Sequence, residues 1–441
     1  MTKNEAFNHQ LIQFLNASPT PFHAVKELAD LLEKAGFKLL NETDIWCLQK
    51  NTGYFVIRNQ SSLIAFTTGD CNFSEQGFRM TGAHTDSPCL KIKPNPDIQK
   101  YHCLQLGVEV YGGALLAPWF DRDLSIAGRV AWYDGTQIHQ TLIDLKRAVA
   151  TIPSLAIHLD SEQNNRRTIN PQTDISPVLA TIFTEDSQTD QTLHHAIKES
   201  LSNIYPHLNI DQILDFELFL YDTQPAAIIG LNNDFIASAR LDNLLSCFTA
   251  TQAIIKAKQS LYPSMIVCND HEEVGSASTS GAQGPFLKQV LQRIVKDNES
   301  RIRTIQHSLM ISADNAHARH PNFPDKHDKK HAPAINHGPV IKINVNQCYA
   351  TNSESSAVFR HLCTQENIPV QLFCSRCDMR CGSTIGPITA SEIGVRTLDV
   401  GLPTYGMHSV RELAGTQDAI MLEKVLTRFY NTSAAQLQLT T

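Results

Sequence analysis

The stretch MIVCNDHEEVGS (residues 265–276) decides the fold, because four apolar residues lead into three acids, a histidine and a Gly-Ser turn. A short apolar run of this kind is typical of a buried strand. Three other runs repeat the pattern: FRMTGA precedes His84, LMISA precedes Asp314, and VRTLDV precedes His408 after a Gly-Leu-Pro turn. The sequence therefore predicts several buried strands that each end at a residue able to bind a metal.

Amphipathic segments alternate with these runs, at residues 244–257 and 286–294. Residues 7–35 show helical spacing of apolar side chains on both sides of a break at 18–21. This alternation predicts an α/β fold, with a three-layer α/β/α catalytic domain. Ligands of open α/β sheets bind beyond the carboxyl ends of the strands, where most of the candidate metal ligands stand.

Residues 89–234 read differently, as a mostly β segment. It begins with a charged segment that is interrupted by prolines, at residues 91–96, and it contains candidate strands at 126–132 and 216–221. We interpret it as an insertion that splits the catalytic domain into residues 1–88 and 235–441. The alternative is that the catalytic sheet continues through this segment.

Composition narrows the class of protein. The 441 residues carry a formal net charge of −7, which argues against nucleic acid as a partner because phosphate binding needs a surplus of Lys and Arg. The N-terminal residues lack the apolar core of a signal peptide, and no apolar run approaches the roughly 20 residues of a membrane helix. We therefore expect a cytoplasmic protein that binds neither membrane nor nucleic acid.

The 11 cysteines fit a disulfide framework poorly, since their number is odd and their spacing irregular. Cys374 and Cys377 form a CxxC pair, with Cys381 four residues later. Free thiols are the favoured interpretation, and a zinc knuckle or a redox role are the alternatives.

Two further acids, Asp86 and Asp242, are candidate site residues because each lies next to a predicted strand or helix end. Asp86 follows His84 by two residues, so that it is placed to hold the imidazole through its second nitrogen. A plain surface pair is the alternative. Asp242 directly precedes the helix that starts near Leu244, where an ordinary N-cap aspartate is the alternative to a metal ligand.

Glu272 and Glu273 would repel each other in one crevice unless a cation separates their roles. With a metal present, one binds it and the other takes a proton from the bound water. Two acids on a solvated loop are the alternative. With one of these glutamates as a ligand, the set is completed by His84, Asp242, Asp314 and His408. These two histidines and three carboxylates suit a pair of Zn, Co or Mn ions.

Several motifs in fixed order resemble those of the aspartyl aminopeptidases and their bacterial relatives, which are di-metal metallopeptidases. The resemblance spans nearly the whole chain. It rests on SPTPFH (18–23), AHTDSP (83–88), WFDRDL (119–124), ARLDN (239–243), DHEEVGS (270–276), GPVIK (338–342), CGSTIGP (381–387) and MHS (407–409).

The resemblance implies a role for each ligand of a pair of divalent ions, with zinc expected and cobalt or manganese as alternatives. Asp242 would bridge the two ions. His84 and Asp314 would complete one site, and Glu273 and His408 the other.

The resemblance also implies further roles. Glu272 would be the general base and Asp86 would orient His84. The insertion would be a dimerisation domain whose His158 reaches a neighbouring subunit's active site, in a tetrahedral dodecamer. Lys342 would meet the carboxylate of a peptide substrate with an acidic N-terminal residue.

The chain departs from the family near the expected specificity pocket, with Cys348 and Ala332 where relatives carry Arg, and Cys377 where they carry Asn. Missing guanidinium groups would weaken recognition of a carboxylate. An aminopeptidase with a preference for Asp or Glu is the first interpretation. A broader aminopeptidase, a related metal-dependent deacylase and a catalytically silent scaffold are the alternatives.

Overall fold

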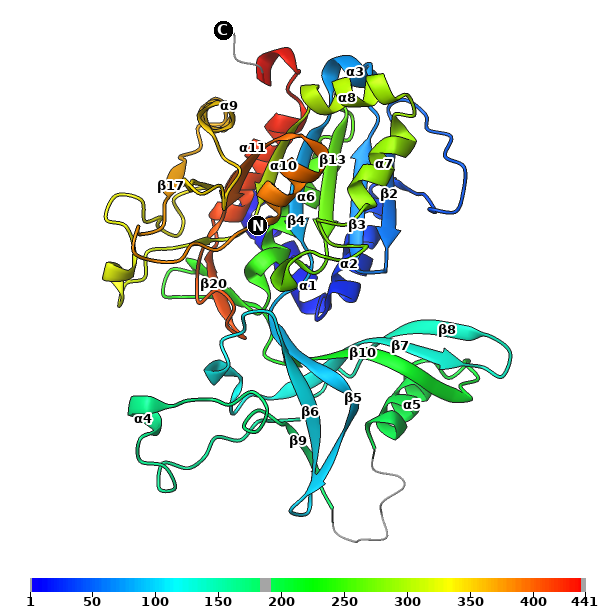
Figure 1. The fold of residues 1–441 in the computed structure, drawn as a ribbon, viewed down its shortest axis with the longest axis vertical. Helices are drawn as coiled ribbons and strands as arrows, with labels where there is room; N and C mark the ends of the chain where they lie inside the picture. Colours follow the sequence, from blue (N-terminus) through cyan, green and yellow to red (C-terminus); the bar gives the residue numbers. More distant parts are fainter. Residues whose placement is uncertain (1, 183–191, 438–441) are drawn as a thin grey trace. The chain divides into compact units, whose positions relative to one another are not determined.

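The computed structural model describes residues 2–182 and 192–437. Contacts divide the chain into two compact units. Figure 1 colours the chain along the sequence, so that the segments of each unit can be found by residue number. The first consists of residues 2–86, 226–407 and 412–437, and the second of Ser87–Pro225 with His408–Arg411. The predicted α/β class is confirmed, and the first unit carries its large sheet.

A nine-stranded sheet forms the centre of the first unit, in the order β1-β2-β3-β13-β4-β14-β18-β16-β17. The strands are β1 (Lys38–Leu39), β2 (Gly53–Arg58), β3 (Ser62–Thr67), β4 (Arg79–His84), β13 (Ser264–Asn269), β14 (Leu309–Ala313), β16 (Val340–Lys342), β17 (Gln371–Phe373) and β18 (Arg396–Gly401). The four central strands β13, β4, β14 and β18 run parallel. Their carboxyl ends therefore meet at one edge of the sheet.

Helices cover both faces of this sheet. The cluster on one face includes side chains of α1 (Lys3–Ala17), α2 (Pro21–Lys34), α6 (Leu241–Lys256), α9 (Ser353–Gln365) and α11 (Asp418–Tyr430). The cluster on the other face includes side chains of α3 (Phe73–Gln76), α7 (Phe286–Ile294), α8 (Asn298–His307) and α10 (Ile385–Ile393). The predicted α/β/α layers are thus present.

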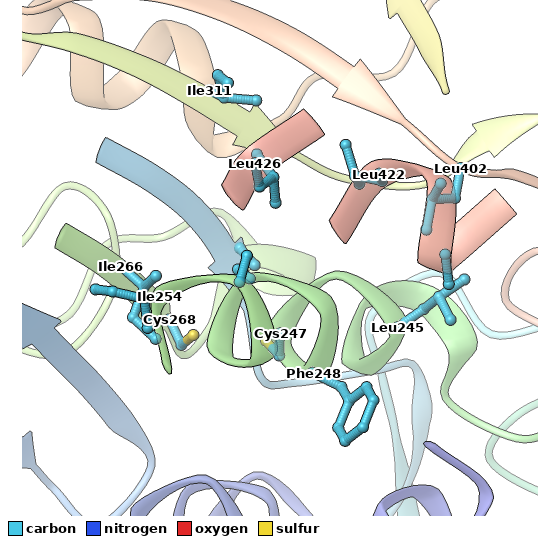
Figure 2. Close-up of a cluster of buried hydrophobic side chains, with 14 of the residues drawn as sticks. Leu245, Cys247, Phe248, Ile254, Ile266, Cys268, Ile311, Leu402, Leu422 and Leu426 are labelled. Carbon is cyan, nitrogen blue, oxygen red and sulfur yellow. The ribbon is translucent and has the colours of Figure 1, made fainter. Parts of the chain in front are cut away.

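Strand β13 shows why the central runs are continuously apolar. Ile266 and Cys268 pack into one cluster, whereas Met265 and Val267 pack into the other. Successive side chains of a strand face opposite sides, so a strand covered on both faces needs apolar residues at every position. Figure 2 shows the first of these clusters, where α6 lies among side chains of β13 and α11.

A second, five-stranded sheet in the first unit has the order β11-β12-β20-β19-β15. Its strands are β11 (Ala227–Ile229), β12 (Phe235–Ser238), β15 (Ala316–His317), β19 (Pro403–Tyr405) and β20 (Glu412–Gly415). This sheet was not predicted from the sequence. One of its strands, β11, belongs to the first unit, although residues 226–234 were assigned to the insertion.

The second unit is built on a six-stranded antiparallel sheet in the order β8-β7-β10-β5-β6-β9. Its elements are β5 (Cys89–Lys100), β6 (Cys103–Tyr111), β7 (Leu124–Tyr133), β8 (Ile138–Asp144), α4 (Gln163–Arg166), β9 (Val178–Thr181), α5 (Leu193–Ile204) and β10 (Gln212–Asp222). The sheet has its own apolar core, to which α5 contributes Leu193, Ile197 and Leu201.

The predicted helical segments match observed helices. The break at 18–21 separates α1 from α2, and Pro21 occupies the first turn of α2, where its missing N–H costs little. Among the described residues, no helix combines the length and the apolar character needed to cross a membrane.

Candidate metal centre

The sheet brings the candidate ligands of the first unit to one edge. His84 is the last residue of β4, and Asp314 directly follows the neighbouring strand β14. Strand β13, on the other side of β4, leads to the 3-10 turn η3 (Glu272–Val274). Asp242 lies in the first turn of α6.

His84 lies at the centre of these acids. Its Nε2 is 3.3 Å from Asp242 Oδ1, 3.5 Å from Asp314 Oδ1 and 4.0 Å from Glu272 Oε2. His84, Asp242 and Glu273 each offer a ligand atom within 4.8 Å of those of the other two. We refer to His84, Asp242, Glu273 and Asp314 as the metal cluster.

Asp86 contacts both His84 and the turn that carries the two glutamates. His84 Nδ1 is 3.0 Å from the backbone oxygen of Asp86 and 3.4 Å from its Oδ1. The fully buried carboxylate also accepts the backbone N–H groups of Glu272 and Glu273, each at 3.1 Å. His271 has a left-handed φ of 63° just before these residues, which turns the chain toward Asp86. Asp86 thus fixes the position of this turn.

Asp242 is not the N-cap of α6, because Arg240 occupies that position. Asp242 lies inside the helix start with a non-helical ψ of 105°. Its backbone N–H donates to Glu412 Oε2 at 2.9 Å, and Asn243 Nδ2 donates to the Ala313 backbone oxygen at 2.8 Å. Neither Glu412 nor Asn243 was predicted from the sequence. The signal for Glu412 in the sequence is weak, a single acid before Leu413 and Ala414.

The buried acids disturb one another's protonation. Burial alone would lower the pKa of His84, but contacts with Asp242, Asp314 and Asp86 raise it well above the usual value. Burial, followed by repulsion from Asp314, raises the pKa of Asp242 to about 7. Burial also raises the pKa of Glu272 to about 8. So many buried acids around one imidazole favour a cation among them.

The residues present fit divalent metal ions. Carboxylate oxygens with an imidazole nitrogen suit zinc and similar ions, and ligands within 4.8 Å of one another can contact the same ion. Asp242 Oδ1 lies 3.3 Å from His84 Nε2, and repulsion from Asp314 and Glu273 adds to the effect of burial on its raised pKa. The individual ligand assignments stay predictions.

Lys342 lies beside the metal cluster, at the end of β16. Its Nζ is 3.2 Å from Asp314 Oδ2, 3.2 Å from the Asp314 backbone oxygen and 2.9 Å from the Asn315 backbone oxygen. Although burial opposes it, the Lys342 ammonium holds the pKa of Asp314 well below its usual range. The predicted contact of Lys342 with a substrate carboxylate stays a prediction.

Two predicted site residues belong to the second unit. His408 Nδ1 is 3.2 Å from the Gly113 backbone oxygen, and the backbone oxygen of His408 accepts the N–H of Leu115. His158 is exposed on a turn. Their predicted roles, as a metal ligand and as a residue of a neighbouring active site, stay predictions.

A cavity of about 280 Å³ in the first unit is lined by many cationic or protonatable side chains, and we call it the cation-lined cavity. Tyr349 and Phe373 contribute apolar wall, and the ring of Tyr349 lies 5.0 Å from Lys342 Nζ. The cavity therefore borders the residues that hold Asp314. Its basic side chains are His317, His320, Lys326, His327, Arg376 and Arg380.

The chain resembles known proteins over nearly its full length. Residues 14–430 match the family described as "Aminopeptidase I zinc metalloprotease (M18)". The "Probable M18 family aminopeptidase 2" of Pseudomonas entomophila is 56% identical over 426 residues, which cover 97% of this chain and 98% of that protein. The protein with the same description from Stutzerimonas stutzeri is 54% identical and covers 97% of this chain and 99% of its own length.

Solved structures agree with this resemblance. A chain of the structure described as the Ape4 and Nbr1 complex superimposes with a TM-score of 0.93 at 37% identity, covering 97% of this chain and 86% of that one. The mApe1 dodecamer of S. cerevesiae gives a TM-score of 0.84 at 28% identity, with 98% of each chain covered. The chain belongs to the M18 family of zinc metallo-aminopeptidases.

Proposed function

We propose that this aminopeptidase holds two divalent ions, zinc in the first instance, and prefers peptides with an acidic N-terminal residue. The metal cluster carries the first part of the proposal, because one imidazole and several buried carboxylates converge at the ends of parallel strands. We assign Asp242 as the bridging ligand, His84 and Asp314 to one ion, and Glu273 and His408 to the other.

We assign Glu272 as the general base. Bound divalent ions would lower the pKa of a water molecule and polarise the scissile carbonyl. Glu272 Oε2 lies 4.0 Å from His84 Nε2, whereas Asp242 Oδ1 lies 3.3 Å from it. A carboxylate beside the metal cluster can take a proton from the attacking water and return it to the leaving amine.

The cation-lined cavity supports the preference for acidic residues. Lys326, Arg376 and Arg380 line it, with Asp328 as a lining acid. Arg376 forms an ion pair with Asp378, with 2.6 Å between Nη2 and Oδ2. A carboxylate that enters the cavity would meet the positive charges of Lys326 and Arg380, whereas that of Arg376 is already paired. The chain has Cys348 and Ala332 where arginines were expected.

We also propose that the chain acts in the cytoplasm as a homo-oligomer of dodecameric size. All 11 cysteines are free thiols, which suits a reducing compartment. A related structure is described as a dodecamer. In such an assembly His158, exposed in the second unit, would reach a neighbouring active site. Light scattering coupled to gel filtration tests the assembly, and a monomeric mass for an active enzyme would contradict it.

The experiment that tests the proposed specificity compares kcat/KM for Asp-, Glu-, Ala- and Leu-nitroanilides. We expect the two acidic substrates to be hydrolysed with the highest kcat/KM. An N-acetylated Asp-nitroanilide serves as the control, because an aminopeptidase requires the free amine. A strong preference for the Leu substrate would contradict the acidic preference, and cleavage of the acetylated substrate would contradict exopeptidase action.

A further inference from the structure

Two loops of the first unit bring together cysteines that the proposed chemistry does not use. Strands β16 and β17 are parallel neighbours, so the segments that follow them start at the same edge of the sheet. We call residues 343–352 the β16 loop and residues 374–384 the β17 loop. The two loops contain four cysteines, namely Cys348, Cys374, Cys377 and Cys381.

A buried carboxylate holds the two loops to each other. Asp399, in β18, is 0% exposed, and each of its oxygens binds a different loop. Oδ2 accepts the backbone N–H of Ala350 at 2.6 Å, and Oδ1 accepts the hydroxyl of Thr384 at 2.6 Å. Ala350 is two residues after Cys348. Thr384 is three residues after Cys381, so the same carboxylate fixes both loops close to a cysteine.

The thiols of Cys348 and Cys381 are direct neighbours. Burial, followed by the interaction with the Cys381 thiol, raises the pKa of Cys348. Cys381 also interacts with the hydroxyl of Tyr349 and packs against the small apolar cluster that contains Tyr349 and Phe373. Both cysteines are free thiols and partly exposed, so a small oxidant can reach them.

This thiol pair lies next to the wall of the cation-lined cavity. Tyr349, which follows Cys348, lines the cavity. Arg380 and Gly382, on either side of Cys381, line it as well. A disulfide would hold the two sulfurs about 2.0 Å apart, which is closer than two thiols can approach. It would therefore draw the loops together, end the contact of Cys381 with Tyr349 and shift the cavity wall.

We propose that Cys348 and Cys381 are a reversible oxidation site, where hydrogen peroxide forms a disulfide that reshapes the cavity wall and lowers peptide hydrolysis. Peroxide converts one thiol into a sulfenic acid and releases water, and the second thiol then displaces the hydroxyl group as another water molecule. The two thiols together lose two electrons and two protons. Transient disulfides of this kind are compatible with a reducing compartment.

The proposal rests on the proposed function in one respect, since it takes the cation-lined cavity as the place of the substrate's first side chain. It does not depend on an acidic preference. The disulfide itself can be detected without any measurement of activity, so the two proposals can fail separately.

The test treats the zinc-loaded, full-length enzyme with hydrogen peroxide and removes the excess with catalase. Mass spectrometry of a non-reduced digest locates the disulfides, and elemental analysis follows the zinc content. The kcat/KM for Asp- and Leu-nitroanilides is measured before treatment, after treatment and after addition of a phosphine reductant. Each protein is compared with its own untreated sample.

Two double variants identify the thiols that respond. Cys348→Ser/Cys381→Ser removes the proposed pair. Cys374→Ser/Cys377→Ser is the matched control, because it removes as many thiols from the β17 loop and leaves the proposed pair in place.

We expect a linked peptide that contains Cys348 and Cys381, with unchanged zinc content. The kcat/KM for the better substrate should fall by up to about 100-fold, because a displacement of about 1 Å can cost that much. The reductant should restore it. Cys348→Ser/Cys381→Ser should keep its kcat/KM on treatment, whereas Cys374→Ser/Cys377→Ser should lose it as the wild type does.

Three results would overturn the proposal. They are a disulfide confined to Cys374 and Cys377, an equal loss of activity in Cys348→Ser/Cys381→Ser, and a linked Cys348–Cys381 pair with unchanged kcat/KM for both substrates. Untreated wild type without aminopeptidase activity or bound metal would instead contradict the proposed function. In that case the non-reduced digest would still show whether the thiol pair is oxidised.

Discussion

The metal cluster and the cation-lined cavity lie in the same unit but are built in different ways. In the metal cluster, His84 and Asp314 stand at the ends of central strands and Asp242 at the start of α6, and all three are buried. The cavity is lined from loops around β15, β17 and β19, and its Lys326 and Arg380 are exposed. The sheet therefore fixes the groups assigned to the chemistry, whereas the groups assigned to selectivity are on segments that can vary without disturbing the core.

The largest expected effect separates chemistry from metal binding. Replacing Glu272 with Gln removes the proton acceptor while the metal cluster keeps its ligands, so kcat should fall about 10²- to 10⁴-fold. Steady-state kinetics measure the loss, and elemental analysis should show the metal content of the wild type. A near-wild-type kcat would remove Glu272 from the role of base.

A smaller effect is expected in the cavity. Removing the charges of Lys326 and Arg380 together as alanines should lower kcat/KM for the Asp substrate about 10- to 100-fold, since hydrogen bonds to charged groups contribute about 1.5–3 kcal/mol. The Leu substrate should be hydrolysed as before. Arg303→Ala, on the exposed side of α8, is the control. Equal losses for both substrates would show that the cavity does not select acidic residues.

The smallest expected effect concerns the pH dependence of stability without metal. Burial raises the pKa of Glu272 from its ordinary 4.5 to about 8. Between these values the folded chain holds a proton that the unfolded chain has released, so the free energy of unfolding falls as pH rises. The Glu272→Gln variant lacks the titrating group, so this pH-dependent fall in the free energy of unfolding should be absent from it.

We therefore expect the melting temperature of metal-free Glu272→Gln to increase relative to the metal-free wild type as pH rises from 5 to 8. Thermal unfolding in the presence of a chelator measures the difference. Glu299→Gln, at an exposed position of α8, should keep a constant difference from the wild type. A constant difference for Glu272→Gln as well would contradict the raised pKa.

The sequence predicted those parts of the fold that follow from periodicity. The strand ends before His84 and Asp314 and the helices α1, α2 and α7 are visible in the sequence because both faces of the central strands, or one face of a helix, must be apolar. The five-stranded sheet was not predicted, because strands such as β15 and β19 are only two and three residues long. Strands this short carry no periodic signal.

Within the site, residue types were predictable but several contacts were not. The N–H contacts of Asp86 with the glutamate turn depend on the left-handed backbone of His271, and Glu412 reaches Asp242 only because β20 pairs with β12. Lys342 was assigned a role through the resemblance to the family. Its contacts with Asp314 and Asn315 arise from the sheet order, in which β18 lies between β16 and β14.

The central claim is that metal held by this cluster is required for hydrolysis, and metal analysis combined with an activity assay tests it most directly. Purified enzyme is analysed for bound metal, stripped with a chelator, and assayed on Asp-nitroanilide before and after zinc is added back. We predict two equivalents of divalent metal per chain, loss of activity on stripping, and recovery with zinc. Full activity in enzyme shown to be metal-free would contradict the account.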